Sequence, residues 1–440
     1  MHTLDHLRTG QLAGLTRLNL AAGLTEFPRE IFDLADTLEV LNLTGNALSA
    51  LPDDLPRLHQ LRVLFCSDNR FTEVPAVLGQ CPNLRMVGFK ANQIRTLPGA
   101  ALPPALRWLI LTDNQLEELP PEIGNCPQLQ KLMLAGNRLT ALPATLAHCT
   151  NLELLRVAAN RLTALPPWLL ALPRLAWLAY AGNPFMAPVE AHTVANHPLG
   201  AIAWPELVVE QLLGAGASGM IYQAQWQRPN TDPEPVAVKV FKGAVTSDGL
   251  PHCEMLACIK AGAHPNLVAV EGKITGHPDG AEGLVLELID EAFGNLAGPP
   301  NLASCTRDVY APGASFSLET TLGMARGIAA AAGHLHAQGI LHGDLYAHNI
   351  LTTADGNALL SDFGAASFLP PHSEAQAVAL QRLEVRAFGC LLEELLAHCP
   401  TPEPASKAMA GLRELQAHCV QPAVATRPLF AEIEQTLAQL

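Results

Sequence analysis

Two carboxylates and an amide in the stretch ILHGDLYAHNILTTADGNALLSDFGAA, residues 340–366, could together hold a metal ion. The carboxylates are Asp344 and Asp362, and the amide is Asn349. Oxygen atoms from such side chains are the ligands that Mg²⁺ prefers, and phosphate groups commonly complete its coordination shell. The stretch therefore suggests magnesium-assisted chemistry on a phosphate, provided that the rest of the chain can position these three side chains.

The local pattern predicts how the three side chains are held. Apolar runs at 349–351 and 358–360 flank the polar turn 354–357, Ala-Asp-Gly-Asn. This arrangement is typical of two short strands joined in a hairpin. We expect the hairpin to place polar groups at both of its ends.

The composition limits what kind of protein this is. The chain has 440 residues, enough for two to three domains, and half of them are apolar, as in a folded protein. A formal charge of −14 argues against nucleic acid or an anionic membrane as a partner. We expect a cytoplasmic protein, because no leader opens the sequence and no apolar run approaches the roughly 20 residues of a membrane span. The ten cysteines lack zinc spacing and are interpreted as reduced, mostly buried thiols.

The first half of the chain is a repeat array. The copies LEVLNLTGNALSALP, LRVLFCSDNRFTEVP and LRMVGFKANQIRTLP begin at Leu38, Leu61 and Leu84, and further copies begin at Leu106, Leu129 and Leu152. Weaker copies flank them at Leu15 and Leu175. Each fits L-x-x-L-x-L-x-x-N-x-L at a period of 22 or 23 residues, which resembles the leucine-rich repeat. The resemblance implies a solenoid of α/β horseshoe type, with a repeat domain over residues 1–185.

An asparagine recurs at the end of each predicted strand. The column consists of Asn46, Asn69, Asn92, Asn114, Asn137, Asn160 and Asn183. In such repeats the amide side chain bonds the loop backbone of neighbouring coils, which satisfies buried polar groups. We therefore assign these asparagines a structural role and not a ligand-binding one.

The outward-facing strand positions predict an apolar concave face. They include Val63, Phe65, Met86, Trp108, Ile110, Met133, Leu154 and Trp177. A monomer's surface is rarely this apolar, so we expect a protein-binding groove. Its occupant is either a protein substrate or regulator, or the second half of this chain. Scattered surface hydrophobic residues are the alternative.

The repeat pattern ends in NPFMAPVEAHTVANHPLGAIAWPE, residues 183–206. We interpret residues 186–205 as a cap or linker, and 206–440 as a second domain. That domain opens with LLGAGASGMIY, in which Gly214, Gly216 and Gly219 form G-x-G-x-x-G and Ile221 follows. A strand, VAVKVF, comes next instead of a helix, and this order excludes a dinucleotide-binding unit.

The motifs that follow agree in order and interval with one family. Lys239 lies in the V-A-V-K strand, Glu254 lies ten residues before the His-Pro-Asn element that begins at His264, and Asp362 opens D-F-G. LEVRAFGCLLEELL and TRPLFAEIEQTL add two helical signatures near the C-terminus. From about residue 207 to 440 the sequence resembles a protein kinase. The resemblance implies a bilobal α+β domain, so we expect a multidomain protein.

The resemblance also implies roles for individual residues. Asp344 would orient the acceptor hydroxyl, while Asn349 and Asp362 would hold Mg²⁺. Lys239 would contact the ATP phosphates and be held by Glu254. The remaining positions implied to bind ATP are Gly214, Gly216, Gly219, Ile221, Ala237, Glu287 and Ile289. Catalysis of this kind consists mainly of positioning and charge neutralisation.

The sequence departs from the kinase pattern in several places. Gly343 stands where the family carries the arginine that grips a phosphorylated activation loop, so we expect no control by phosphorylation of that loop. Only 19 residues, 365–383, separate D-F-G from Glu384, and none reads A-P-E. Arg427 loses its usual A-P-E partner, so it would need another carboxylate or be exposed. Tyr346 replaces a lysine that is typical of Ser/Thr kinases.

These observations favour an ATP- and Mg²⁺-dependent protein kinase with a leucine-rich repeat interaction module. Serine or threonine is the expected acceptor, although Tyr346 and His348 leave tyrosine open. A pseudokinase scaffold is one alternative, suggested by the missing A-P-E region. The other is a small-molecule kinase, because HGDLYAHNIL resembles the loop of aminoglycoside phosphotransferases; D-F-G and His-Pro-Asn argue against it.

Overall fold

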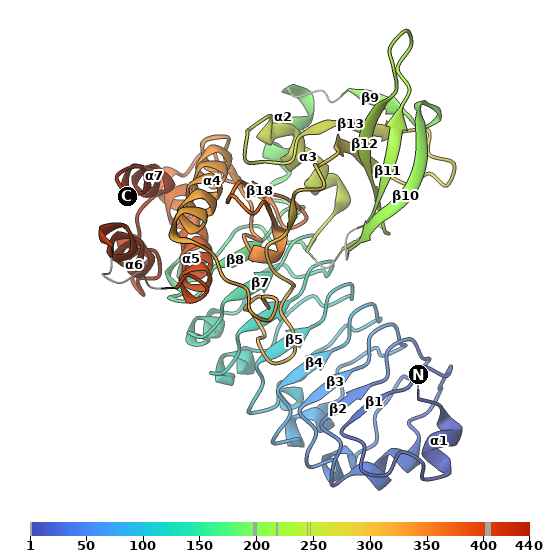
Figure 1. Cartoon of the computed structure of the whole chain (residues 1–440). Helices are drawn as coiled ribbons and strands as arrows, with labels where there is room; N and C mark the ends of the chain where they lie inside the picture. Colours follow the sequence, from blue (N-terminus) through green and yellow to red (C-terminus); the bar gives the residue numbers. More distant parts are fainter. Residues whose placement is uncertain (1, 197–199, 217–218, 244, 247, 401–405) are drawn as a thin grey trace. The chain divides into compact units, whose positions relative to one another are not determined.

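The computed structural model describes residues 2–196, 200–216, 219–243, 245–246, 248–400 and 406–440. By its internal contacts the chain divides into two compact units, Met1–Leu172 and Pro173–Leu440 (Figure 1). The division falls before the last repeat copy, so this copy packs within the second unit. The domain limits predicted at residues 185 and 206 remain predictions.

The first unit is a solenoid of parallel strands, as predicted. Its strands are β1 (Arg17–Asn19), β2 (Val40–Asn42), β3 (Val63–Phe65), β4 (Met86–Gly88), β5 (Trp108–Ile110), β6 (Lys131–Met133) and β7 (Leu154–Arg156). Each pairs with the next in register, so that Leu41, for example, lies beside Leu18 and Leu64. These central leucines are fully buried. One three-residue strand per repeat therefore builds a continuous core.

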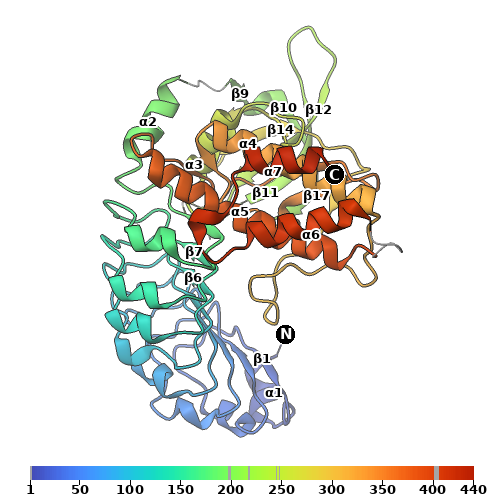
Figure 2. The ribbon, with the colours of Figure 1, turned by 90° about the vertical axis from the view of Figure 1, so that its left-hand side faces the viewer.

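Short helical turns return the chain from one strand to the next. A helix, α1 (Leu4–Arg8), precedes the array, and 3₁₀ helices occupy Arg29–Leu34, Leu55–Arg57, Ala76–Gln80, Gly99–Ala101, Pro121–Asn125, Ala144–His148 and Pro167–Ala171. Figure 2 shows these turns on one side of the solenoid and the strands on the other. Most of these 3₁₀ helices directly follow a proline, which limits where the turn can begin.

The asparagine column has the structural role that the sequence predicted. The side-chain oxygen of Asn114 accepts the backbone N–H of Ile94 at 2.9 Å. Its amide nitrogen donates to the carbonyl oxygens of Phe89 and Leu111. The same pattern recurs at Asn137 and Asn160. Each asparagine thus satisfies the loop backbone of two successive coils.

The second unit begins with the last repeat strand, β8 (Trp177–Ala179), and α2 (Ala187–Asn196). A six-stranded sheet follows in the order β10-β11-β12-β14-β13-β9. Its strands are β9 (Ala201–Ala203), β10 (Leu207–Ala215), β11 (Gly219–Trp226), β12 (Glu234–Phe241), β13 (Val270–Thr275) and β14 (Gly283–Glu287). Val236, Val238 and Val285 lie in its core. The segment expected to be a cap or linker therefore contributes an edge strand, β9, to this sheet.

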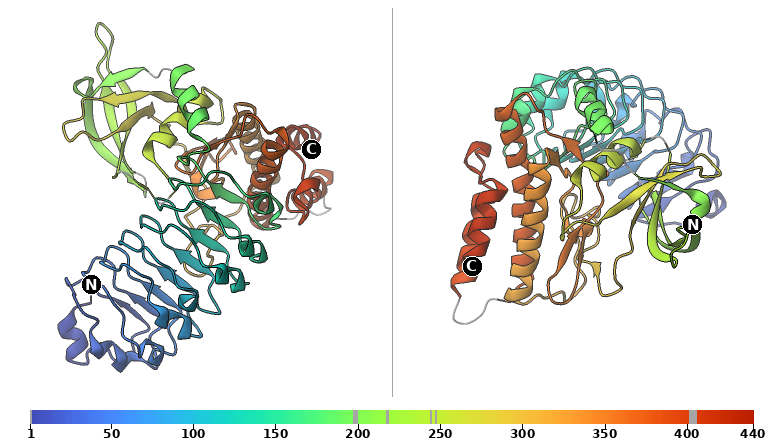
Figure 3. Two further views of the ribbon diagram at one scale, coloured as in Figure 1. Left: turned by 180° about the vertical axis from the view of Figure 1, so that it is seen from behind. Right: turned by 90° about the horizontal axis from the view of Figure 1, so that it is seen from above.

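The rest of the second unit is mainly helical. Its helices are α3 (Pro251–Ala261), α4 (Leu318–Ala337), α5 (Glu374–Ala397), α6 (Lys407–Cys419) and α7 (Phe430–Ala438). Short strands β15 (Gly294–Asn295), β16 (Ile340–Leu341), β17 (Ile350–Thr352), β18 (Ala358–Leu360) and β19 (Ser367–Phe368) lie among them. Figure 3 shows the long helices α4 and α5 side by side. β17 and β18 form the predicted hairpin.

Among the residues that the structure describes, no helix is both long enough and apolar enough to cross a membrane.

Candidate active site

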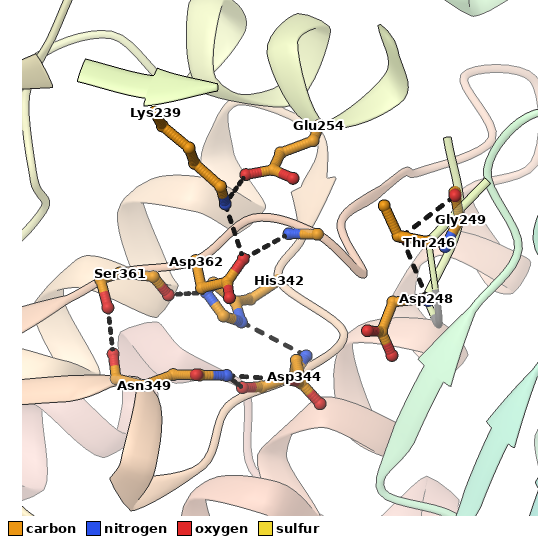
Figure 4. Close-up of polar contacts among 11 residues, drawn as sticks. Lys239, Thr246, Asp248, Gly249, Glu254, His342, Asp344, Asn349, Ser361 and Asp362 are labelled. Atoms are coloured by element: carbon orange, nitrogen blue, oxygen red, sulfur yellow. Dashed lines mark hydrogen bonds and ion pairs between the residues drawn. The ribbon is translucent and has the colours of Figure 1, made fainter. Parts of the chain in front are cut away.

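The lysine predicted to contact phosphates lies in the centre of the six-stranded sheet. Lys239 on β12 is in register with Ile221 of β11 and Leu284 of β14. Its side chain is buried, and its ammonium forms an ion pair with Glu254 and a second one with Asp362 at 3.3 Å. Figure 4 shows the three side chains converging from the sheet, from α3 and from the loop after β18. The Lys239–Glu254 pairing expected from the sequence is present.

Helix α3 positions Glu254. The helix begins with Pro251 and ends before Gly262, whose φ of 64° suits only glycine well. Glu254 lies in the first turn and faces inward, with 3% of its surface exposed. A carboxylate that is buried in this way requires a partner, and Lys239 provides it.

The three charged groups shift one another's pKa values. Burial alone would lower the pKa of Lys239, but the charges of Asp362 and Glu254 outweigh it and raise that pKa. Burial raises the pKa of Glu254 to about 7, although Lys239 opposes the shift. Burial alone would raise the pKa of Asp362, but Lys239 and the N–H of Gly364 hold that pKa below its usual range. Lys239 and Asp362 are therefore charged at neutral pH, whereas Glu254 titrates there.

Asp344 and Asn349 lie on residues 342–349, here called the catalytic loop, and form a second cluster below Lys239 (Figure 4). The amide nitrogen of Asn349 donates to the carboxylate of Asp344 at 2.8 Å and to its backbone carbonyl at 2.9 Å. Asn349 is buried in a one-turn helix between Tyr346 and β17. These bonds fix the side chain of Asp344 and leave the amide oxygen of Asn349 as the group that can bind a cation.

Buried polar residues hold this loop in place. The N–H of Asp344 donates to Nδ1 of His342, and Nε2 of His342 donates to the Ser361 carbonyl at 2.9 Å. The carboxylate of Glu384, on α5, accepts the backbone N–H groups of His342 at 3.2 Å and Gly343 at 2.6 Å. Hydrogen bonds to ionised groups are among the stronger ones in proteins. The loop thus has a fixed backbone before any ligand binds.

Asp362 adopts a backbone conformation that non-glycine residues rarely use. Its φ is 57°, and its carboxylate accepts the N–H of Gly364 at 3.1 Å. Left-handed backbone at a residue other than glycine costs about 1–2 kcal/mol, and such residues concentrate at functional sites. The conformation turns the Asp362 carboxylate toward Lys239.

A cavity of about 610 Å³ lies between these elements. Predicted site residues that line it are Gly216, Ile221, Ala237, Lys239, Glu254, Glu287, Ile289, Asn349 and Asp362. Gly214 lies on β10, Gly219 begins β11, and the N–H of Gly216 donates to the Gly219 carbonyl, so the three predicted glycines form one hairpin. Gly214, Gly219 and Asp344 do not line the cavity themselves, although Asp344 is hydrogen-bonded to Asn349, which does. The structure therefore brings most of the predicted site together.

The residues around the cavity fit a nucleotide with a divalent cation. The cavity volume falls within the range of small-molecule sites, and its walls are apolar at Ile221, Ala237 and Leu286. At the other end, Asp362 and Asn349 offer oxygen ligands that suit Mg²⁺, and Lys239 offers a positive charge for phosphate. The predicted roles of these residues remain predictions.

The predicted concave face is arranged in two rows within the first unit. Register places Val63, Met86, Trp108, Lys131 and Leu154 in one row, and Phe65, Gly88, Ile110 and Met133 in the other. Phe65 and Trp108 meet edge to face at 6.5 Å between ring centroids. Phe65, Trp108, Ile110 and Met133 are half-buried, as expected for a surface that can take a partner.

Four residues assigned to that face are buried, which corrects the prediction that they are exposed for a partner: Val63, Met86 and Leu154 in the first unit, and Trp177 in the second. Trp177 was expected to face either a partner or the second half of the chain, and it contacts the latter. Only 1% of its surface is exposed, because the ring packs on Tyr346 of the catalytic loop within the second unit. The repeat pattern gives the direction of a side chain but not what the strand lies against.

Sequence reasoning also missed a partner of the catalytic loop. Asp308 accepts the backbone N–H of His348 at 2.9 Å and pairs with its Nδ1 at 2.7 Å. Burial would lower the pKa of His348, but Asp308 raises it overall. Asp308 comes from the long segment 295–315, which has no periodic pattern. No signal in the sequence linked the two residues.

Comparison with known proteins supports the two-part organisation. Residues 207–387 match the family model of protein tyrosine and serine/threonine kinases, and residues 104–162 match a leucine rich repeat model. The second match lies inside the first unit. The first match covers strands β10 to β14 of the six-stranded sheet, the Lys239–Glu254 pair and the loop that carries Asp344.

Individual relatives are distant and are similar over only part of their length. Fibroblast growth factor receptor 1 from Xenopus laevis is 24% identical over 261 residues, which are 52% of this chain and 31% of the receptor. Ephrin type-A receptor 8 from Mus musculus is 26% identical over 44% of this chain and 20% of the receptor. Ephrin type-B receptor 4 from Homo sapiens is 28% identical over 38% of this chain and 16% of the receptor. Together with the fold and the family models, these matches identify the chain as leucine-rich repeats followed by a protein kinase domain.

Proposed function

We propose that the second unit transfers the γ-phosphoryl group of ATP, with Mg²⁺, to a hydroxyl group of a protein. The observation that carries this proposal is the continuous set of contacts from Glu254 through Lys239 to Asp362, beside the Asp344–Asn349 pair. A protein that only displays a surface has no physical need of all five residues in this arrangement. The pseudokinase alternative is therefore the weaker one.

Each residue has a distinct task in this proposal. Lys239 binds and orients the phosphates of the nucleotide, and Glu254 holds the ammonium in position. Asp344 accepts the hydrogen bond of the acceptor hydroxyl and takes up its proton. Asn349 and Asp362 would hold Mg²⁺, which would supply neutralisation of negative charge on the phosphates.

We further propose that phosphorylation of the segment after D-F-G does not control this site. Gly343 offers no guanidinium to bind a phosphate there. The segment is also short, since α5 already begins at Glu374. Serine or threonine remains the proposed acceptor, but the matched family model covers both acceptor types and so does not favour either.

The leucine-rich repeats are proposed to bind a protein substrate or regulator through the rows that include Phe65, Trp108, Ile110 and Met133. Proteins of this repeat class expose an extended concave surface that suits this purpose. The cytoplasm is the proposed location, as the cysteine usage of the sequence suggests.

The test is transfer of label from γ-labelled ATP with Mg²⁺ to the purified chain or to an added protein, in the wild type and in Asp344→Asn. We expect label in the wild type and a loss of at least 100-fold in the variant, with nucleotide binding retained. Acid hydrolysis then identifies the labelled amino acid. Full activity in Asp344→Asn would show that its assigned role is wrong.

Absence of label with ATP still bound would contradict the proposal and favour a scaffold. Transfer to a metabolite hydroxyl but not to protein would favour the small-molecule kinase. Lys239→Met provides a second check, since it should impair transfer strongly and nucleotide binding less.

A further inference from the structure

We propose that the last repeat copy, residues 173–180, is a built-in part of the kinase site, and that its Trp177 is a positioning residue for the catalytic loop. This copy would support the catalytic loop in place of a longer segment after D-F-G. The inference rests on the proposed function for its effect on catalysis. The contacts themselves lie within the second unit and do not depend on it.

Trp177 contacts the catalytic loop in two ways. Its indole N–H donates to the backbone carbonyl of Leu345 at 3.0 Å. Its ring stacks on that of Tyr346 with 4.1 Å between centroids and 6° between planes. Leu345 and Tyr346 directly follow Asp344, and all three aromatic and apolar side chains involved are buried. A shift of Trp177 would therefore move the backbone that carries Asp344.

Gly343 shows that the loop is shaped to fit this copy. A Cβ atom at Gly343 would lie 2.9 Å from the carbonyl oxygen of Leu178 on β8 and 2.5 Å from that of Ala365. The φ of Gly343 is 73°, which also disfavours any other residue. The space that a side chain next to Asp344 would need is therefore occupied by the backbone of Ala365 and by that of the last repeat.

The segment after D-F-G is bound by the same copy. The backbone N–H of Tyr180 donates to the hydroxyl of Ser367 at 3.0 Å, and the Tyr180 hydroxyl donates to the Phe368 carbonyl at 2.8 Å. Ser367 and Phe368 form β19, which pairs with β16 immediately before His342. Tyr180 is fully buried, and burial raises the pKa of its hydroxyl, so it remains a donor.

Two arginines fix the beginning of the copy. Arg427 donates to the carbonyl oxygen of Pro173 at 2.7 Å, and Arg386 donates to that of Arg174 at 3.1 Å. The sequence suggested that Arg427 would need a carboxylate or be exposed; instead it is 1% exposed and also binds the carbonyls of Gln421 and Arg382. Burial lowers its pKa to about 10, so it stays charged at neutral pH.

The burial of these contacts argues for a permanent element and against a removable lid. Trp177, Tyr180 and Arg427 are each at most 1% exposed. Displacing the copy would expose these side chains and leave several backbone carbonyls without donors, each at a cost. The chain that follows this copy is also held within the second unit. Glu190 of α2 accepts the N–H of Gly182, and α2 packs on α3.

The test compares two tryptophans, one in the last repeat copy and one in the first unit. Trp177→Leu removes the stacking and the indole donor, whereas Trp168→Leu, in the 3₁₀ helix Pro167–Ala171, is the control. Trp177→Phe keeps an aromatic ring and removes only the donor. We expect kcat for phosphoryl transfer to fall by about 100-fold in Trp177→Leu, about tenfold in Trp177→Phe and less than about twofold in Trp168→Leu. The KM for ATP should change little.

Hydrogen exchange of the amides in residues 340–349 and 365–369 gives a readout besides activity. In Trp177→Phe we expect exchange there to accelerate by about tenfold, with thermal unfolding confirming that the variant folds. Tyr180→Phe, which deletes one hydroxyl, should accelerate exchange near Phe368. Unchanged exchange and unchanged kcat in Trp177→Leu, Trp177→Phe and Tyr180→Phe would overturn the proposal.

The two proposals fail in different ways. If the wild-type chain transfers no phosphate but the Trp177 variants exchange faster, the proposed kinase function is wrong and the contact of Trp177 with the catalytic loop is supported. If the wild-type chain transfers phosphate and Trp177→Leu leaves kcat unchanged, the kinase function is supported and the positioning role of Trp177 is wrong. Increased kcat in Trp177→Leu would show that the copy blocks the site, and would also overturn the inference.

Discussion

Two tryptophans open equivalent strands of two repeat copies, yet their surroundings differ. Trp108, on β5, is half-buried, and the ammonium of Lys131 lies 4.4 Å from its ring centroid. Trp177, on β8, is fully buried and hydrogen-bonded to the catalytic loop. The same sequence motif therefore gives a half-buried ring in the first unit and a buried ring against the catalytic loop in the second. Identity of pattern between repeats does not imply identity of role.

The largest expected effect concerns two glycines with nearly the same backbone conformation. Gly45 in the first unit has φ 76° with open space around it, whereas Gly343 has φ 73° and two carbonyl oxygens in the way. Gly343→Ala should destabilise the second unit by about 4 kcal/mol, because backbone strain and a steric clash add. It should also abolish phosphoryl transfer.

Gly45→Ala is the control and should cost only about 1 kcal/mol, from strain alone. Thermal unfolding of both variants, followed by calorimetry, measures the difference. Equal losses of stability would mean that the carbonyl oxygens of Ala365 and Leu178 do not lie against Gly343.

The next effect concerns two arginines. Arg427→Met should destabilise the second unit by about 3 kcal/mol, because three backbone carbonyls lose a charged donor in a buried place. Arg8→Met removes an exposed ion pair with Glu30 and should cost less than about 1 kcal/mol. Urea unfolding of the two variants tests this, and a small loss for Arg427→Met would argue against its contact with Pro173.

The smallest expected effect is a pH dependence. Burial raises the pKa of Glu254 to about 7, so acidification below that value neutralises the partner of Lys239. Transfer activity should therefore be low in acid and increase as the pH rises through about 7. The rate measured from pH 5.5 to 8.5 should follow this course, while Glu254→Gln should be low and flat over the same range. An activity that stays constant down to pH 5.5 would contradict the assignment.

Much of this arrangement could be predicted from the sequence because it depends on local pattern. The strands of the repeats, the asparagine column and the hairpin 349–360 follow from spacing, and the resemblance to protein kinases implied the Lys239–Glu254 pair. The environment of Trp177 and the partners of Arg427 could not be predicted in the same way. They depend on how a repeat coil lies against a loop more than 160 residues away in the sequence.

Departures from the expected pattern were more informative than agreements. The glycine at 343 and the missing partner of Arg427 each indicated a lost contact when the sequence was considered alone. In the structure, residues 173–178 contact both positions, and Ala365 also lies against Gly343. Two departures far apart in the sequence thus meet the same repeat copy.

Hydrogen exchange of the wild-type chain under increasing urea tests the central claim most directly. If the last repeat belongs to the kinase unit, the amides of residues 177–180 should open together with those of residues 340–349 and 367–368, at one urea concentration. The amides of strands β1 to β7 should form a separate group. If residues 177–180 opened with β1 to β7 while the catalytic loop stayed protected, the last copy would be an ordinary repeat and our account of the site would be wrong.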